Sequence, residues 1–138
     1  MTTANRGKAA EAAVKKILSS MESASMTSAR WPDARSGSFV TAPCDFVALR
    51  KGKFVLLEVK AVEHEYRLPH KNASPDQIAR MRNWEAAGAD AWVLVHFAPL
   101  KLWRTETVGY FLQREGGSWD MRHLEARPLN EIMLEIFQ

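Results

Sequence analysis

The chain has 138 residues, one cysteine and a formal net charge of +3. A single cysteine excludes an intrachain disulfide, and the lack of paired Cys and His ligands argues against a structural zinc site. We expect one domain over residues 1–138, because a chain of this length can bury enough apolar surface to fold without cross-links. With no apolar leader and no run of about 18 apolar residues, the sequence predicts a soluble, cytoplasmic protein with no membrane partner.

Positive charge is concentrated in the first part of the chain. Residues 1–82 contain 14 Lys and Arg against 8 Asp and Glu, whereas residues 83–138 contain 5 against 8. A basic region favours a polyanionic partner such as nucleic acid. A solvated mixed-charge surface would explain the net charge alone, so it is the location of the excess that favours nucleic acid.

The first predicted element is a helix over residues 6–21, capped by Asn5. Its apolar residues recur at intervals of three and four, which is typical of a helix with one buried face. Glu11 borders that face. A carboxylate beside an apolar stripe usually reaches solvent or serves the helix end, so periodicity alone assigns Glu11 no function.

Residues 23–37 are small, polar and rich in turn signals, which predicts a loop. Within it, Arg30 and Arg35 flank Trp31, and this combination suits contacts to phosphates and bases. A loop whose tryptophan packs into the core explains the pattern equally well. A short strand is expected over residues 38–41.

Residues 44–60, with the sequence CDFVALRKGKFVLLEVK, predict two strands joined by a tight turn at residues 50–53. Asp45 begins the first strand. Glu58 and Lys60 lie two apart near the end of the second, so they share one face of the sheet. The second strand is otherwise apolar on both faces, which indicates a central strand covered on both sides.

A second basic and aromatic segment follows the hairpin. Residues 61–73 predict a connector that contains Arg67 and Lys71 beside Tyr66 and His70, another candidate contact to nucleic acid.

The next helix has a clear start. Ser74 is the expected N-cap of a helix over residues 75–87, and Gln77 completes a capping box, which is a sufficient explanation of Gln77 by itself. The apolar run at residues 91–97 predicts a buried strand, parallel to the hairpin strand that precedes the helix. Exposed strands at 100–103 and 108–112 and a short helix at 131–137 complete the expected elements. The predicted fold class is α/β, with a mixed central β-sheet flanked by helices.

Asp45, Glu58 and Lys60 form the strongest candidate site. Phosphodiester hydrolysis needs a hard cation that binds a phosphate oxygen and lowers the pKa of the attacking water. Carboxylate oxygens suit Mg²⁺, and a lysine beside them can orient the water or stabilise the added charge. A surface Glu-Lys pair at a strand end is the plainer interpretation, worth about 0–1 kcal/mol.

Several motifs resemble one family. The D-x₁₂-E-V-K hairpin followed by a helix resembles the PD-(D/E)xK nuclease fold, which is restriction-endonuclease-like. The segments N-R-G-K-x-x-E at residues 5–11, C-D-F with R-K-G-K-F in the hairpin, D-Q-I-A-R-M at 76–81 and A-W-V-L-V at 91–95 occur in the order found in RecU-type Holliday junction resolvases. The resemblance covers roughly the first 97 residues. It departs from the pattern at Cys44, where the superfamily has proline, and in a shorter stalk segment at 24–42.

The resemblance implies a function and a set of roles. It implies a Mg²⁺-dependent endodeoxyribonuclease, with Mn²⁺ able to substitute, that makes paired nicks in four-way DNA junctions as a homodimer during recombination and repair. The implied catalytic residues are Asp45, Glu58, Lys60, Glu11 and Gln77, the implied metal ligands are Asp45, Glu58, Val59 and Glu11, and the candidate DNA contacts are Arg6, Lys8, Arg30, Trp31, Arg35, Arg67 and Lys71.

Two alternatives remain open from the sequence. One is a nuclease of the same fold that acts on linear duplex, flap or single-stranded DNA. The other is a DNA-binding module that keeps the fold without catalysis, although the intact Asp45, Glu58 and Lys60 set argues against it.

Overall fold

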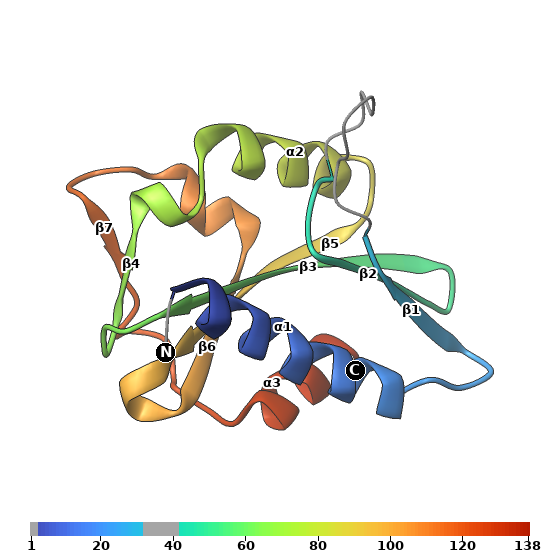
Figure 1. Ribbon diagram of the computed structural model, residues 1–138. Coiled ribbons are helices and arrows are strands. Elements are labelled where there is room, and N and C mark those ends of the chain that lie inside the picture. The colour runs from blue at the N-terminus through green and yellow to red at the C-terminus, as the bar shows by residue number, and fades with distance from the viewer. Residues whose placement is uncertain (1–2, 32–41) are drawn as a thin grey trace.

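The computed structural model describes residues 3–31 and 42–138. The helices are α1 (Thr3–Ser20), α2 (Pro75–Ala86) and α3 (Leu129–Ile136), with 3₁₀ turns η1 (His70–Asn72), η2 (Ala98–Leu100) and η3 (Val108–Leu112). The strands are β1 (Met26–Arg30), β2 (Phe46–Arg50), β3 (Lys53–Val62), β4 (Arg67–Pro69), β5 (Asp90–Phe97), β6 (Leu102–Thr107) and β7 (Ser118–Asp120) (Figure 1). None of the helices in these two ranges is long and apolar enough to cross a membrane.

A five-stranded mixed sheet forms the centre of the molecule, in the order β1-β2-β3-β5-β6. The pairing of β3 with β5 is parallel and the other three pairings are antiparallel. Helices α1 and α3 cover one face, while α2 and η3 cover the other (Figure 1). The predicted α/β class with a mixed sheet and flanking helices is therefore confirmed.

Strand β3 is buried on both faces, as predicted. Val55, Leu57 and Val59 pack in the core beneath α1 and α3, whereas Leu56 packs in the core beneath α2. Burial of this kind stabilises a fold by about 25 cal/mol per Å² of apolar surface. A central strand held from both sides is a rigid base for the polar residues near its carboxyl end.

The β2–β3 turn is tight because two residues adopt positive φ angles. Lys51 has φ 49° and Gly52 has φ 81°, a pair of values that matches a two-residue type I′ hairpin. The Lys51 N–H also donates to the carbonyl of Ser25, at 3.1 Å. The chain before β1 thus braces the turn and fixes the register of the hairpin.

The structure corrects the predicted start of the chain. Helix α1 begins at Thr3, so Asn5 lies inside it and does not cap it. Strand β1 occupies part of the predicted 23–37 loop and pairs with β2. Of its five residues only Thr27 is a strong strand former, so the strand signal is weak, and β1 forms because an edge of β2 is available for pairing. The predicted strand over 38–41 lies outside the described residues.

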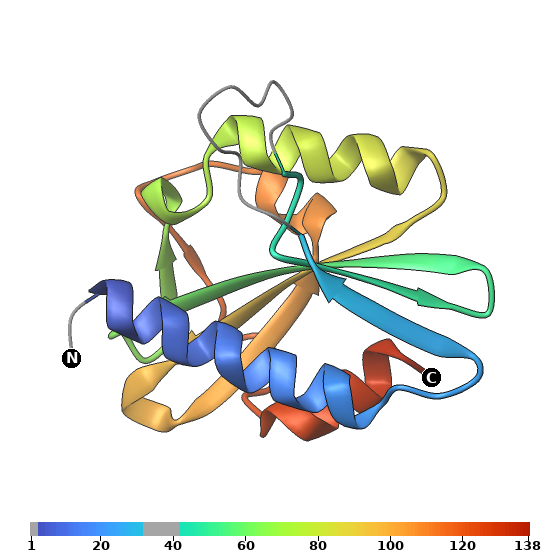
Figure 2. The ribbon, with the colours of Figure 1, turned by 45° about the vertical axis from the view of Figure 1, so that its right-hand side comes forward.

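Two further elements were wrongly predicted or missed in the second half. Residues 108–112 form η3 and not a strand; Val108 and Phe111, three apart, are its buried residues, as a 3₁₀ turn requires. The predicted 61–73 connector contains β4, which pairs with β7 in a separate two-stranded sheet beyond the carboxyl end of β3 (Figure 2).

Candidate active site

Asp45 immediately precedes β2 and lies beside β3. The last ladder pair joins Phe46 to Leu57, and the Asp45 N–H extends it by donating to the Leu57 carbonyl at 3.2 Å. Two residues further along β3, the hydrogen-bond partner is the Asp45 side chain and not a backbone carbonyl of β2, because Asp45 Oδ2 accepts the Val59 N–H at 2.8 Å. The end of β1 supports this arrangement, since the Trp31 N–H donates to the Asp45 carbonyl at 2.7 Å.

Glu58 and Lys60 share a face of β3, as predicted from their spacing. Glu58 is only 5% exposed, and its Oε2 lies 2.9 Å from the Lys60 ammonium nitrogen. The same oxygen accepts a hydrogen bond from Gln77 Nε2 at 2.6 Å. Two donors on one oxygen satisfy the buried carboxylate and hold it in one position.

Gln77 contacts both the candidate site and the N-cap residue of α2. Its backbone N–H donates to Ser74 Oγ at 3.1 Å, which confirms Ser74 as the N-cap. Its side chain points to Glu58 and does not return to Ser74, so the predicted reciprocal capping box is only half formed. A residue whose sequence context explained it completely thus has a second contact that no local pattern reveals.

Glu11 reaches the site from the middle of α1. Its carboxyl group is close enough to that of Asp45 for each to shift the pKa of the other, and its Oε1 lies 3.1 Å from an Arg30 guanidinium nitrogen at the end of β1. The structure therefore brings Glu11 beside Asp45, which periodicity alone had not indicated. The Arg30 contact was missed because β1 itself was not predicted.

The crowded carboxyl groups perturb one another. Burial, followed by the charge of Glu58, raises the pKa of Asp45 from 3.8 to about 6. Burial, followed by the hydrogen bond to Asp45, raises the pKa of Glu11 above its usual value. Both shifts mean that negative charge is costly here without a compensating cation.

The donor set fits a divalent cation that keeps part of its water shell. Within residues 3–31 and 42–138, no three His, Cys, Asp or Glu side chains are arranged to hold a metal by themselves. Asp45 and Glu58 nevertheless match the one or two protein carboxylates that Mg²⁺ takes. The Val59 N–H faces Asp45, and the carbonyl of a strand residue faces the same side as its N–H. The Val59 carbonyl therefore points to the side where β2 has ended.

Cys44 is not a competing nucleophile. Its thiol is buried and donates to the Phe46 carbonyl at 3.1 Å. Burial, followed by the charge of Glu58, raises its pKa from 9.0 to about 12. The thiol therefore stays protonated at neutral pH, when only a thiolate would attack.

The candidate DNA contacts of the first half have different environments. Arg6 forms an ion pair with Glu63, with 2.9 Å between guanidinium and carboxylate, and only 14% of the Arg6 side chain is exposed. Lys8 is exposed. Trp31 is half-buried and packs edge-on against Trp84, with ring centroids 5.4 Å apart.

Two further candidates lie on β4 and η1. Arg67 is exposed on β4, Lys71 is exposed on η1, and Arg35 falls outside the described residues. The structure therefore gathers the predicted catalytic residues into one site, whereas the predicted DNA contacts among the described residues come from several different elements.

The fold and the site define a class. The β2–β3 hairpin of the mixed sheet brings Asp45, Glu58 and Lys60 together. This arrangement is the core of a restriction-endonuclease-like, PD-(D/E)xK nuclease. Residues 5–114 match the RecU family, described as Recombination protein U, and the protein belongs to this family.

A solved structure shows the same fold. Hjc from Archaeoglobus fulgidus, a Holliday junction resolvase from an archaeal hyperthermophile, has a TM-score of 0.63 and 21% identity to this chain. The similarity covers 91% of this chain and 98% of Hjc. A comparison with curated proteins found no match.

Proposed function

We propose that this protein is a Holliday junction resolvase, acting as a single metal-dependent endonuclease domain in DNA recombination and repair. One observation carries the proposal: Asp45, Glu58 and Lys60 meet on a RecU-family chain with Gln77 bound to Glu58. The shared fold with Hjc, a resolvase, supports the choice of substrate.

Mg²⁺ is the proposed cofactor, with Mn²⁺ able to replace it. Asp45, Glu58 and the Val59 carbonyl would hold the ion, and Glu11 would act as an accessory carboxylate. When bound, the ion would supply a Lewis acid for the phosphate and lower the pKa of the attacking water. The raised pKa of Asp45 supports this assignment, because a bound cation would offset both causes of the shift, the burial of the carboxyl group and the negative charge of Glu58.

The protein side chains would position the reacting groups. Lys60 is the proposed catalytic lysine, whose ammonium group would orient the water and stabilise charge that develops on the phosphate. Gln77 would keep Glu58 in place, since both Gln77 and Lys60 contact the same Glu58 oxygen. The Val59 N–H would do the same for Asp45.

The proposed substrate also requires more than one site. A four-way junction is cut by paired nicks, which a homodimer with two opposed sites would make. Contacts to the DNA arms are proposed for Arg6, Lys8, Arg30, Trp31, Arg35, Arg67 and Lys71. Arg30 contacts Glu11 directly, which places it beside the proposed metal site.

Cleavage of matched substrates tests the proposal. Four-way, flap, linear duplex and single-stranded DNA would be incubated with Mg²⁺, and the nicks mapped on each strand. We expect symmetric paired nicks on the four-way junction only, and none with Glu58→Gln, which should still bind the junction. Preferred cleavage of another substrate would assign a different nuclease activity. If none of the substrates were cut in the presence of the metal, the protein would instead be a DNA-binding module without catalysis.

A further inference from the structure

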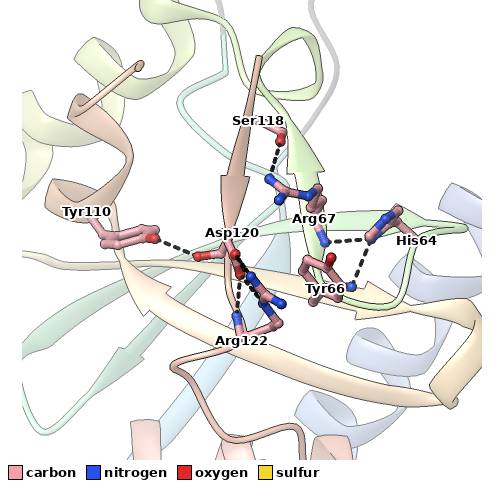
Figure 3. Close-up of polar contacts among 7 residues, drawn as sticks. All are labelled: His64, Tyr66, Arg67, Tyr110, Ser118, Asp120 and Arg122. Atoms are coloured by element: carbon pink, nitrogen blue, oxygen red, sulfur yellow. Dashed lines mark hydrogen bonds and ion pairs between the residues drawn. The ribbon is translucent and has the colours of Figure 1, made fainter. Parts of the chain in front are cut away.

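A group of polar side chains, two of them exposed and two half-buried, lies on the two-stranded sheet. Tyr66, Arg67, Asp120 and Arg122, here called the Arg–Tyr cluster, come from β4 and β7 and the residues next to them (Figure 3). Asp120 and Arg122 lie beyond residues 5–114, the part that matches the RecU family. Family membership therefore says nothing about half of the cluster.

Strand pairing explains why these residues meet. Arg67 is opposite Asp120, and Leu68 is opposite Trp119. Leu68 and Trp119 are buried, so alternation places Arg67 and Asp120 on the outer face. The Met121 N–H donates to the Tyr66 carbonyl at 2.9 Å and extends the pairing by one step.

The base of the cluster is fixed. Arg104 is buried and donates to the carbonyls of Glu65 at 2.8 Å and Leu124 at 2.9 Å, which ties together the segments that follow β3 and β7. His64 Nδ1 accepts the N–H groups of both Tyr66 and Arg67 (Figure 3). An exposed site with its backbone held in this way loses little conformational freedom when it binds a ligand.

Two guanidinium groups flank one aromatic ring. The central guanidinium carbons of Arg67 and Arg122 lie 5.3 and 4.3 Å from the centroid of Tyr66. Arg67 also contacts Ser118 Oγ at 3.3 Å, and Arg122 forms a two-point pair with Asp120, its shortest distance being 2.6 Å. Both cations are therefore held near one another with defined orientations.

Asp120 cancels one charge but leaves Arg122 available. The Arg122 side chain is 61% exposed despite the pair. A guanidinium has five N–H donors, and the Asp120 carboxylate occupies only some of them. Asp120 therefore orients Arg122 and leaves N–H groups directed to solvent.

We infer that the Arg–Tyr cluster binds the phosphate backbone of a duplex DNA arm that extends from the active site. Guanidinium groups match phosphate geometry, and because both groups lie against the Tyr66 ring they can contact neighbouring phosphates on one strand. The cluster lies beyond the carboxyl end of β3, the strand that carries Glu58 and Lys60, and at the opposite end from the β2–β3 hairpin (Figure 1). The inference rests on the proposed function, because it takes the substrate to be DNA.

Salt dependence of binding is the measurement that tests it. The dissociation constant of the full-length protein for a four-way junction and for a linear duplex would be measured in EDTA, which prevents cleavage, between 50 and 200 mM salt. The logarithm of the association constant falls linearly with the logarithm of the salt concentration, and each lost phosphate contact makes this slope shallower by about 0.9. We expect Arg67→Gln and Arg122→Gln each to lower the slope by about that amount, and the double variant by about twice as much.

Arg82→Gln is the matched control, because Arg82 is also an exposed arginine in an ion pair, with Glu85 on α2. It should leave the slope at the wild-type value. A double variant that keeps the wild-type slope and an unchanged circular dichroism spectrum would refute the inference, and so would a wild-type protein that binds neither DNA.

The result is separable from the proposed function. A wild-type protein that binds but never cuts the junction would refute the nuclease, while a loss of slope in the double variant would still support the cluster as a DNA contact. Normal junction cleavage with unchanged slopes would refute only the cluster.

Discussion

The molecule has two polar clusters, and the pKa values of their aspartate side chains shift in opposite directions. The carboxyl groups of buried Glu58 and half-buried Asp45 and Glu11, here called the buried cluster, lie close together, and the pKa of Asp45 rises to about 6. In the exposed Arg–Tyr cluster, hydrogen bonds from Arg122 lower the pKa of Asp120 to about 2. The same side-chain type is thus driven toward protonation in one place and toward ionisation in the other.

The difference shows what burial does for function. Desolvated carboxyl groups carry a penalty that a bound cation can relieve, which suits chemistry at a phosphate. An exposed carboxylate beside arginines carries no such penalty and serves to orient them. We therefore expect changes in the buried cluster to affect the cleavage rate, and changes in the exposed cluster to affect DNA affinity alone.

Lys60→Ala should give the largest effect. Loss of one preorganised donor to developing charge costs about 10²–10³-fold in rate, so single-turnover cleavage of a four-way junction with Mg²⁺ should fall by this factor. Arg67→Gln, at saturating DNA, should cut at nearly the wild-type rate. Near-normal turnover by Lys60→Ala would show that the site assignment is wrong.

Asp45→Asn should stabilise the metal-free protein at pH 8 while abolishing cleavage. Because the folded-state pKa of Asp45 is above its unfolded value of 3.8, the folded state binds more protons, and wild-type stability falls as pH rises from about 4 to 6. A shift of about two units corresponds to about 2–3 kcal/mol, of which we expect Asn to recover about 1–2 kcal/mol. Thermal or urea unfolding in EDTA at pH 4 to 8 would measure this.

Asp120→Asn is the control for the sign of that effect. The pKa of Asp120 is lowered, so its contribution to stability is present above about pH 4 and is lost as pH falls toward 2. The variant should therefore keep the wild-type decline in stability between pH 4 and 6. A decline that persists unchanged in Asp45→Asn would contradict the pKa assigned to Asp45.

Gln77→Ala should reduce cleavage by about 10-fold, a smaller effect, because it removes one donor to Glu58 and leaves the backbone cap of α2 in place. Ser74→Ala removes the cap and should cost about 1 kcal/mol of stability while cleavage changes little. Comparing the two variants by cleavage rate and by urea unfolding would separate the roles. Equal losses of rate in both would mean that Gln77 acts only through the helix.

Local patterns predicted the hairpin part of the buried cluster well. Alternation in β3 and the Lys-Gly turn fixed the hairpin, and hence the shared face of Glu58 and Lys60. Ser74 and Pro75 located the start of α2. Each of these depends on residues close together in sequence, for which strand and helix periodicity is sufficient.

Contacts between distant segments could not be predicted in the same way. Strand β1 has a weak strand signal, and without it the Arg30–Glu11 ion pair could not be foreseen. Strand β7 has three residues and exists through its pairing with β4, so the approach of Arg122 to Tyr66 is a property of the tertiary fold. The helix position of Gln77 did not indicate its contact with Glu58, and only the family resemblance had assigned Gln77 to the site.

A crystal structure with bound Mn²⁺, located by its anomalous scattering, tests the central claim most directly. We expect one ion or more between Asp45 and Glu58, with the Val59 carbonyl as a further ligand, Glu11 turned toward the ion and no ion at the Arg–Tyr cluster. An occupied site elsewhere, with Asp45 and Glu58 left without a cation, would contradict the account.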